Sequence, residues 1–325
     1  MTHALLDGSP PLHAPDPDRP GVVHVDHVCY SYGRVKALVD VNLVLPRGAL
    51  YALLGPNGSG KTTLLQILMG LRRAQSGSAR VFGVDSTALS IGDRARIGYI
   101  AEGQPLPGWM RLEQLEAYLA PLYDAWDKDL ARTLRDRFML DPARKIKTLS
   151  RGEQMKAALL CALAPRPSLL VMDEPFTGMD ALVKDELVNG LLETSSAEGW
   201  TVLLCSHDIG ELDLLADWVG FLDRGRMALS EPMQSLRDRF RRVDVTWDEA
   251  MPPIESLISK DWYAIEHGER RLRFVASIGD EAAERDLAAR LGAASHVNVQ
   301  AATLREVFVA LAGRSRSRVN AERAR

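Results

Sequence analysis

The chain has 325 residues, of which 46% are hydrophobic and 26% are charged, and 40 Lys and Arg nearly balance 43 Asp and Glu for a formal net charge of −3. This composition is that of an ordinary globular protein and argues against disorder of the whole chain, a collagen-like repeat or a coiled coil. The charge balance gives no case for general nucleic-acid binding, so we expect no nucleic-acid partner. The length allows one large domain and a smaller one.

Residues 1–20 carry five prolines and no basic segment followed by an apolar run, which predicts a disordered Pro-rich N-terminus rather than a signal peptide. No run of about 18 apolar residues occurs, because the best candidate, Met155–Met172, contains a lysine, an arginine and two prolines. We therefore expect no membrane span and a cytoplasmic protein. The three cysteines are far apart in apolar runs and are predicted to be buried, reduced thiols.

The first predicted elements are strands. Val22–Tyr32 alternates apolar and polar residues, and Val41–Leu45 and Ala49–Leu54 are two more β-like runs, so an antiparallel beginning is expected. The third run enters a glycine-rich loop and continues as Leu64–Leu71, which has helical apolar spacing. The order is strand, glycine loop, helix.

A helical block is predicted next, followed by the centre of a sheet. Arg111–Tyr123, Lys128–Phe138 and Ser150–Leu163 have amphipathic helical spacing. Ser168–Met172 and Thr201–Cys205 are short apolar runs that end in polar residues, as buried parallel strands with functional groups at their carboxyl ends do.

A second, α+β domain is predicted after the composition turns basic around Arg237–Arg242. The tail, residues 313–325, holds five Arg and one Glu with almost no apolar residues, which predicts a basic disordered segment. The elements expected in this domain are strands at Val243–Trp247, Arg271–Ser277 and Val297–Gln300 and helices at Glu281–Leu291 and Leu304–Leu311.

The glycine-rich loop has the pattern of a phosphate-binding P-loop. Glycines let backbone N–H groups wrap phosphates, and the following helix adds the positive end of its dipole. Lys61 is predicted to reach the β- and γ-phosphates of a nucleotide, and the Thr62 hydroxyl to bind Mg²⁺. The candidate nucleotide-binding residues are Gly55, Pro56, Asn57, Gly58, Ser59, Gly60, Lys61, Thr62 and Thr63.

A pair of carboxylates ends the next apolar run. Asp173 and Glu174 follow Leu169–Met172, an arrangement that places one carboxylate near a P-loop Mg²⁺ and the next beside the attacking water. Asp173 is the predicted metal ligand, and Glu174 the predicted general base or water-orienting group.

With Leu149–Gln154 (LSRGEQ) between these motifs and Ser206–Asp208 (SHD) after the next strand, the chain resembles the ATP-binding subunit of an ABC transporter over about residues 22–231. The resemblance implies an α/β fold, that of the P-loop ABC ATPases, with an antiparallel β subdomain and a helical subdomain at about 103–165. The ATPase domain would span 21–238, and a small C-terminal α+β domain 239–312. ATP and Mg²⁺ are the implied substrate and cofactor.

The resemblance also implies roles for single residues. Ser150 and Gly152 match the signature motif, which meets the γ-phosphate of ATP held on a second cassette. His207 matches the switch histidine, a catalytic residue with Lys61 and Glu174, although it could instead cap a helix running to Ala216. Asp180 matches the loop that crosses the dimer interface. Tyr32 stands where the family stacks an aromatic ring on adenine. Tyr30 is the second choice, and both could be core residues.

Three positions depart from the family pattern. Glu102 replaces the usual glutamine that senses Mg²⁺ and the attacking water, which makes Glu102 a candidate nucleotide and metal ligand. Gln104, two residues on, is the alternative sensor. Arg151 and Glu153 stand where Gly and Gln are commonest and would add two side chains near the nucleotide.

Partners and location follow from the same resemblance. One P-loop and one signature imply a second cassette, most simply a second copy of this chain. Glu102, Tyr123–Asp127 and Thr303–Phe308 resemble bacterial exporter cassettes with a separate transmembrane permease, which would hold the protein at the cytoplasmic face of the inner membrane. Trp109, Met110 and Leu112 are candidates for an apolar permease-contacting surface, or for an ordinary helix core.

Two other functions could use a P-loop of this kind. A soluble, non-transport ABC-type ATPase is the alternative to a transporter subunit, whereas a P-loop kinase or small GTPase leaves the signature and His207 unexplained. For the second domain, Arg241–Leu311, the hypothesis is a regulatory or dimer-stabilising role.

Overall fold

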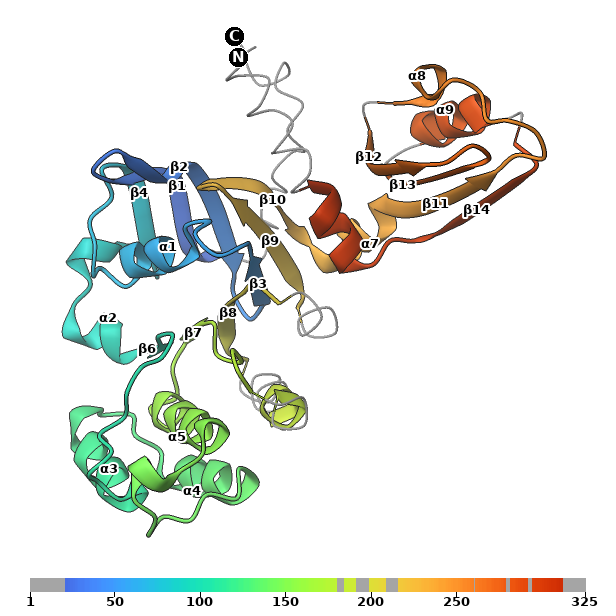
Figure 1. The fold of residues 1–325 in the computed structure, drawn as a ribbon. Helices are drawn as coiled ribbons and strands as arrows, with labels where there is room; N and C mark the ends of the chain where they lie inside the picture. Colours follow the sequence, from blue (N-terminus) through green and yellow to red (C-terminus); the bar gives the residue numbers. More distant parts are fainter. Residues whose placement is uncertain are drawn as a thin grey trace. The chain divides into compact units, whose positions relative to one another are not determined.

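The structure is a computed structural model that describes residues 21–179, 184–190, 199–208, 216–259, 261–278, 281–291 and 294–311 (Figure 1). The chain forms two compact units that divide between Ser230 and Glu231. The second unit therefore begins earlier in the chain than the boundary expected at residue 238. The reason is that helix α7 (Met233–Arg239) packs against strand β11 (Phe240–Thr246) of the second unit. The expected termini, 1–20 and 313–325, and Asp180 lie outside the described residues.

An antiparallel sheet opens the first unit, with strand order β2-β1-β4-β5. Strand β1 (Gly21–Tyr32) pairs with β2 (Val35–Pro46) on one side and with β4 (Ser76–Val81) on the other, and β5 (Val84–Asp85) follows β4. The alternation in the sequence of β1 buries one face, with valines such as Val23 and Val25 in the core.

The second sheet has six strands in the order β10-β9-β3-β8-β7-β6. Strand β3 (Leu50–Leu54) runs parallel to both β8 (Thr201–Ser206) and β9 (Trp218–Asp223), and all five of its residues are buried. The expectation that this run belongs to the antiparallel beginning is therefore wrong, since a fully apolar run is typical of a strand covered on both faces. The remaining strands are β6 (Ile97–Ile100), β7 (Leu169–Asp173) and β10 (Arg226–Pro232).

The parallel strands set the position of the predicted motifs. Strand β7 pairs in parallel with β8, and β8 with β3, so the carboxyl ends of these three strands meet at one edge of the sheet. The P-loop follows β3, Glu174 follows β7 and His207 follows β8. The sheet thus brings together three segments that are far apart in the sequence.

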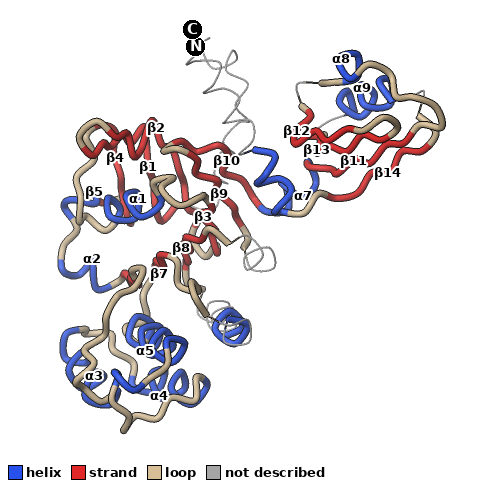
Figure 2. Tube along the Cα trace, in the orientation of Figure 1, coloured by secondary structure: helices blue, strands red, loops and turns tan. Residues whose placement is uncertain are grey.

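The expected helical block lies between β6 and β7, where α3, α4 and α5 gather (Figure 2). The helix expected at 111–123 is shorter, because Pro121 has no N–H to continue the α-helical pattern and lies in a 3₁₀ turn, Ala120–Leu122. No helix in the described segments is both long enough and apolar enough to cross a membrane. This unit contains the α-helices α1 (Lys61–Leu68), α2 (Ile91–Ala95), α3 (Leu112–Leu119), α4 (Lys128–Arg137) and α5 (Arg151–Leu163), and residues 184–190 are also helical.

The second unit has a four-stranded antiparallel sheet with the order β12-β13-β11-β14. The chain order β11, α8, β12, β13, α9, β14 is the βαββαβ arrangement of ferredoxin-like domains. Its core contains Trp262 stacked on Phe274, with ring centroids 3.8 Å apart. Residues 304–311 add a final helix. The other bounds are α8 (Ile254–Leu257), β12 (Trp262–His267), β13 (Arg271–Ser277), α9 (Glu281–Leu291) and β14 (His296–Ala301).

Phe274→Ala tests whether this stack holds the second unit together. The Phe274 side chain is fully buried, so its loss is expected to cost about 3–5 kcal/mol of unfolding free energy and to lower the thermal transition of this unit. Differential scanning calorimetry measures the effect, with ATP affinity as the readout for the first unit. Val309→Ala, at a side chain that is 54% exposed, is the matched control and should change stability by no more than about 0.5 kcal/mol. Equal transitions in the two variants would contradict the assignment.

Candidate nucleotide-binding site

Glycine is required at both ends of the loop between β3 and α1. Gly60 has a left-handed φ of 110°, and a Cβ there would lie 2.5 Å from the carbonyl oxygen of Ala37. A Cβ at Gly55 would lie 2.3 Å from the carbonyl oxygen of Leu222. Helix α1 has no side-chain cap and no acidic residue in its first turn, so its N–H groups and positive dipole end are available to an anion.

Lys61 begins this helix and turns its side chain into the protein. Its Nζ donates a hydrogen bond to the carbonyl oxygen of Gly55 at 2.7 Å and lies 3.1 Å from Oε1 of Glu174. The side chains of Lys61 and Glu174 are 6% and 7% exposed, so water screens this ion pair weakly. A buried ammonium group therefore lies next to the loop that would hold phosphate.

Glu174 is held from the other side by His207. Nδ1 of His207 lies 2.7 Å from Oε2 of Glu174, and the backbone N–H of His207 donates to the same oxygen at 3.3 Å. Glu174 has a left-handed φ of 49°, a costly backbone conformation for a residue other than glycine. The structure thus places the three predicted catalytic residues, Lys61, Glu174 and His207, in one connected group.

Asp173 is buried, and within the described part of the chain the only polar group that acts on it as a hydrogen-bond donor is the nearby Thr62 hydroxyl. The residue is 1% exposed, and neither carboxylate oxygen accepts a hydrogen bond of ordinary geometry. Burial raises its pKa, and the negative charges of Glu174 and Glu102 raise it further, whereas the Thr62 hydroxyl and the Lys61 charge lower it. A buried carboxylate that lacks an ordinary hydrogen bond and lies near a hydroxyl is a suitable pair of oxygen ligands for a hard cation.

The protein supplies only part of a metal site here. Among the described residues, no group of three or more His, Cys, Asp or Glu side chains could hold a metal ion. Mg²⁺ is commonly held by one or two carboxylates together with substrate phosphates, so Thr62 and Asp173 fit such an ion in the presence of a nucleotide. The Ser59 hydroxyl, also buried without a hydrogen-bond partner, lies in the same loop region.

Glu102 and Gln104 have different surroundings. Oε1 of Gln104 accepts the backbone N–H of Ala101 at 3.1 Å, which uses the side chain to close its own turn. Glu102 is exposed in that turn, and its charge acts on Asp173. The structure therefore shows that the charge of Glu102 reaches the predicted metal ligand, whereas the Gln104 side-chain oxygen is engaged within its own turn.

The two tyrosines of β1 also differ. Tyr30 packs against the core, and its hydroxyl accepts a hydrogen bond from Arg72 at 3.1 Å. Tyr32 is 43% exposed, and its hydroxyl lies 3.3 Å from that of Thr63 behind the P-loop. The guanidinium carbon of Arg72 lies 4.9 Å from the centre of the Tyr32 ring, a cation–π contact that sequence analysis did not find. No motif or residue spacing in the sequence indicates that Arg72 contacts this ring.

The signature residues lie at the start of α5. Ser150 caps this helix: its Oγ accepts the N–H of Glu153, and the Glu153 carboxylate accepts the N–H of Ser150 at 2.7 Å. This hydrogen bond, with Arg144 at 2.6 Å, lowers the pKa of Glu153. Gly152 is buried within the helix. No hydrogen bond or ion pair links Ser150 or Gly152 to the P-loop in the described part of the chain.

Arg151 and Glu153 do not both face outward. Glu153 is occupied by the cap and by Arg144, whereas Arg151 is exposed and packs against the loop that follows Glu174. A Cβ on Gly178 would lie 2.4 Å from Nη1 of Arg151, so a side chain there would displace the guanidinium group, and the left-handed φ of 73° at Gly178 also favours glycine. Only one of the two unusual side chains is thus available to a ligand.

The candidate apolar surface of the helical block needs correction. Leu112 is fully buried, because it lies on the inner face of α3, so it is a core residue and cannot contact a partner. Trp109 is 72% exposed and Met110 is half-buried. Tyr118 and Leu122, which the sequence analysis did not single out, are 59% and 61% exposed.

Comparison with known proteins identifies similar chains. The sequence pattern of the family described as "ABC transporter" matches residues 38–177. The sulfate/thiosulfate import ATP-binding protein CysA of Bacillus cereus is 33% identical over 214 residues, which cover 63% of this chain and 60% of CysA, less than two thirds of that protein. The lantibiotic transport ATP-binding protein SrtF of Streptococcus pyogenes is 31% identical over 216 residues, which cover 65% of this chain and 90% of SrtF.

Solved structures share the fold. A structure described as the ATP-binding subunit of an ABC transporter superposes with a TM-score of 0.61 at 26% identity, covering 67% of this chain and 92% of that one. The dimeric bacterial cassette MJ0796 superposes with a TM-score of 0.58 at 24% identity, covering 65% and 98% of the two chains.

Asp173→Asn is expected to stabilise the fold while damaging the site. The ionised carboxylate is buried without an ordinary hydrogen bond, so a neutral amide should raise the unfolding free energy by about 1–3 kcal/mol. Because the pKa of Asp173 is raised in the folded state, the penalty for the ionised carboxylate is complete above that folded pKa, shrinks as the pH falls through it, and is absent below the unfolded pKa of about 4, so the gain from the amide should fade over the same range.

Thermal unfolding in EDTA, without nucleotide, measures this effect. Asp136→Asn, at an exposed position of α4, is the matched control and is expected to change stability by no more than about 0.5 kcal/mol. A lower transition temperature for Asp173→Asn than for wild type at neutral pH would contradict the prediction.

Proposed function

We propose, because the chain belongs to the ABC transporter family of ATP-binding subunits, that its ATPase site uses Glu174 as general base, with Lys61 and His207 as the groups that release and orient it. The observation that carries this proposal is the position of Glu174 between Lys61 and His207, beside the P-loop.

ATP binding would rearrange the buried ion pair. The P-loop N–H groups and the start of α1 favour the triphosphate, and the Lys61 ammonium lies where it can turn from Glu174 to the β- and γ-phosphates. The Glu174 carboxylate then loses a cationic partner and becomes a better proton acceptor. Nucleotide binding and activation of the base are thereby coupled through one lysine.

Hydrolysis requires one water molecule. Its oxygen attacks the γ-phosphorus, Glu174 accepts its proton, and the bond between the γ-phosphorus and the bridging oxygen breaks to give ADP and inorganic phosphate. His207, which contacts Glu174 through both its ring and its backbone N–H, would orient the carboxylate and donate a hydrogen bond to the γ-phosphate.

Thr62 and Asp173 would hold Mg²⁺, with Glu102 as a further ligand. The ion would neutralise negative charge on the β- and γ-phosphates. Support for this set comes from the two Asp173 oxygens without ordinary hydrogen bonds and from the influence of Glu102 on the Asp173 pKa.

A second copy of the chain would complete the site. In the described residues, no hydrogen bond or ion pair links Ser150 or Gly152 to the P-loop of their own chain, which leaves the signature able to meet ATP on the other copy. Contacts to one ATP from two subunits would favour the closed dimer, and hydrolysis would remove them. Asp180, outside the described residues, would lie in the loop crossing this interface.

A transmembrane permease is the proposed second partner. The exposed side chains of Trp109, Tyr118 and Leu122 are suited to an apolar contact, which would hold the protein at the cytoplasmic face of the inner membrane. Export is the proposed direction, from the likeness of Glu102 and the segments 123–127 and 303–308 to exporter cassettes. The rival is a soluble, non-transport ABC-type ATPase.

Two variants, Glu174→Gln and Glu102→Gln, distinguish the role of the general base, Glu174, from that of the proposed metal ligand, Glu102. Loss of the general base should lower kcat by about 10²–10⁴ while ATP binding is retained, and gel filtration with Mg-ATP should show a stable dimer. Glu102→Gln keeps an oxygen ligand and should retain activity within about tenfold. Equal losses of kcat in the two variants would contradict the assignment of Glu174 as the general base.

The transporter proposal is tested with the same Glu174→Gln chain. The tagged protein is purified with Mg-ATP from detergent-solubilised membranes of its host, and a polytopic membrane protein is expected to copurify. Trp109→Ala in this background should reduce that recovery, whereas Arg132→Ala, at an exposed α4 residue, should not. Recovery of only a soluble dimer, or of ribosomes or DNA, would contradict the transport role.

A further inference from the structure

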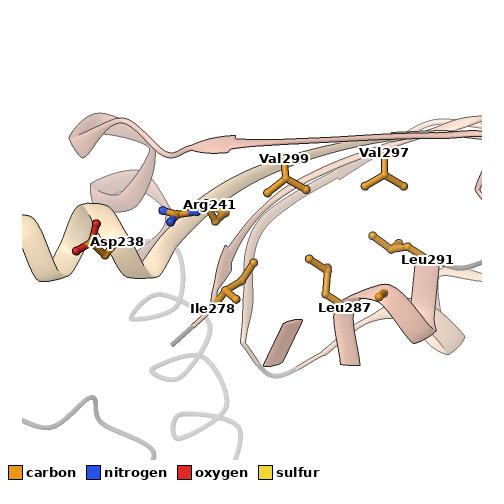
Figure 3. A pocket seen from close by; sticks show the side chains of 8 residues that line it. Asp238, Arg241, Ile278, Leu287, Leu291, Val297 and Val299 are labelled. Carbon is orange, nitrogen blue, oxygen red and sulfur yellow. The ribbon is translucent and has the colours of Figure 1, made fainter. Parts of the chain in front are cut away.

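The second unit contains a cavity between helix α9 and strand β14 (Figure 3). Its volume is about 470 Å³, within the range of about 300–1,000 Å³ typical of small-molecule sites. Apolar side chains from three elements form most of its wall: Leu287 and Leu291 of α9, Val297 and Val299 of β14, and Ile278 after β13.

The cavity exists because α9 covers the sheet incompletely. Val297 and Val299 pair across the strands with Val245 and Val243, so all four valines lie on one face. The two β11 valines are fully buried, yet Val297 and Val299, on the edge strand, are 39% and 46% exposed. An apolar face that should be covered is therefore open along the β14 edge.

Two opposite charges stand at one end of this cavity. Figure 3 shows Asp238 and Arg241 together at the end away from Leu291. Nη1 of Arg241 donates to the carbonyl oxygens of Arg237 and Phe240, which leaves Nε and Nη2 without a hydrogen-bond partner among the described residues. Oδ1 of Asp238 accepts a hydrogen bond from Gln234 at 2.9 Å.

Asp238 and Arg241 do not neutralise each other. Within the described part of the chain, the ion pairs of this unit involve other residues, such as Arg239 with Glu231 and Arg242 with Asp244. One anionic and one cationic group thus both remain available beside the same apolar wall. A ligand complementary to this end carries both a negative and a positive charge.

We propose that this cavity binds an apolar α-amino acid. The ligand carboxylate would pair with Arg241 and its ammonium group with Asp238, and its side chain would cover the exposed faces of Val297 and Val299. A fatty acid would leave Asp238 unsatisfied, and an apolar amine would leave Arg241 unsatisfied. The proposal is independent of the ATPase site and makes the second unit a sensor of a small metabolite.

Ligand analogues on the wild-type chain give the first test. Isothermal titration calorimetry and thermal unfolding, both without nucleotide, are performed with L-leucine and L-phenylalanine. Saturable binding and a raised transition of the second unit are expected for at least one of them. Two analogues remove one charge each: 4-methylpentanoate lacks the ammonium group and 3-methylbutylamine lacks the carboxylate. Each should bind at least about tenfold more weakly than leucine, and glycine should not bind.

Two variants then assign the charges to residues. Arg241→Gln should abolish the preference for leucine over 3-methylbutylamine, and Asp238→Asn the preference over 4-methylpentanoate. Arg305→Gln, an exposed arginine of the final helix, is the matched control and should bind as wild type does. Binding of neither amino acid by the wild type, equal binding of leucine and 4-methylpentanoate, or binding unchanged in both variants would overturn the proposal. Because no step uses ATP, these results do not depend on the ATPase assignment.

Discussion

The buried ion pair between Lys61 and Glu174 connects the two halves of the nucleotide site. It forms only because β3 and β7 both run parallel to β8, so that the P-loop and the carboxylate pair emerge at the same sheet edge. A shift in this register would move every group at the edge at once. The burial of these strands therefore matters for chemistry as much as for stability, since it fixes the distances on which the pair depends.

This site is maintained at the expense of local stability. Asp173 is a buried carboxylate without an ordinary hydrogen bond and with a raised pKa, and Glu174 has a left-handed backbone conformation. Such features persist only where the surrounding structure imposes them, and here the fully buried strands β3 and β7 do so. Strain and buried charge are concentrated at the point where a cation would compensate the Asp173 carboxylate.

Sequence reasoning succeeded where the chemistry lies in consecutive residues. The P-loop and the Asp173–Glu174 pair are short motifs at strand ends, and the structure places both at the expected edge. It failed where long-range packing decides: β3 was assigned to the antiparallel beginning, and for Leu112 a partner-contacting surface and a helix core could not be told apart until the fold showed it buried. The contact between Arg72 and Tyr32 could not be predicted from the sequence, because a cation–π contact between distant segments leaves no pattern in either segment.

Different observations mark the nucleotide site and the cavity of the second unit. In the first unit, the P-loop motif predicts a nucleotide ligand. The two carboxylate oxygens of Asp173 that lack an ordinary hydrogen bond in the described residues are consistent with a metal ion beside that nucleotide. In the second unit, Asp238, Arg241, Leu287 and Val299 come from four elements, so no window of sequence contains the site. Only the fold reveals that two opposite charges, neither in an ion pair with a described residue, lie beside an open apolar face. Uncovered apolar area costs free energy, and its coincidence with these two charges is the feature that the proposed ligand explains.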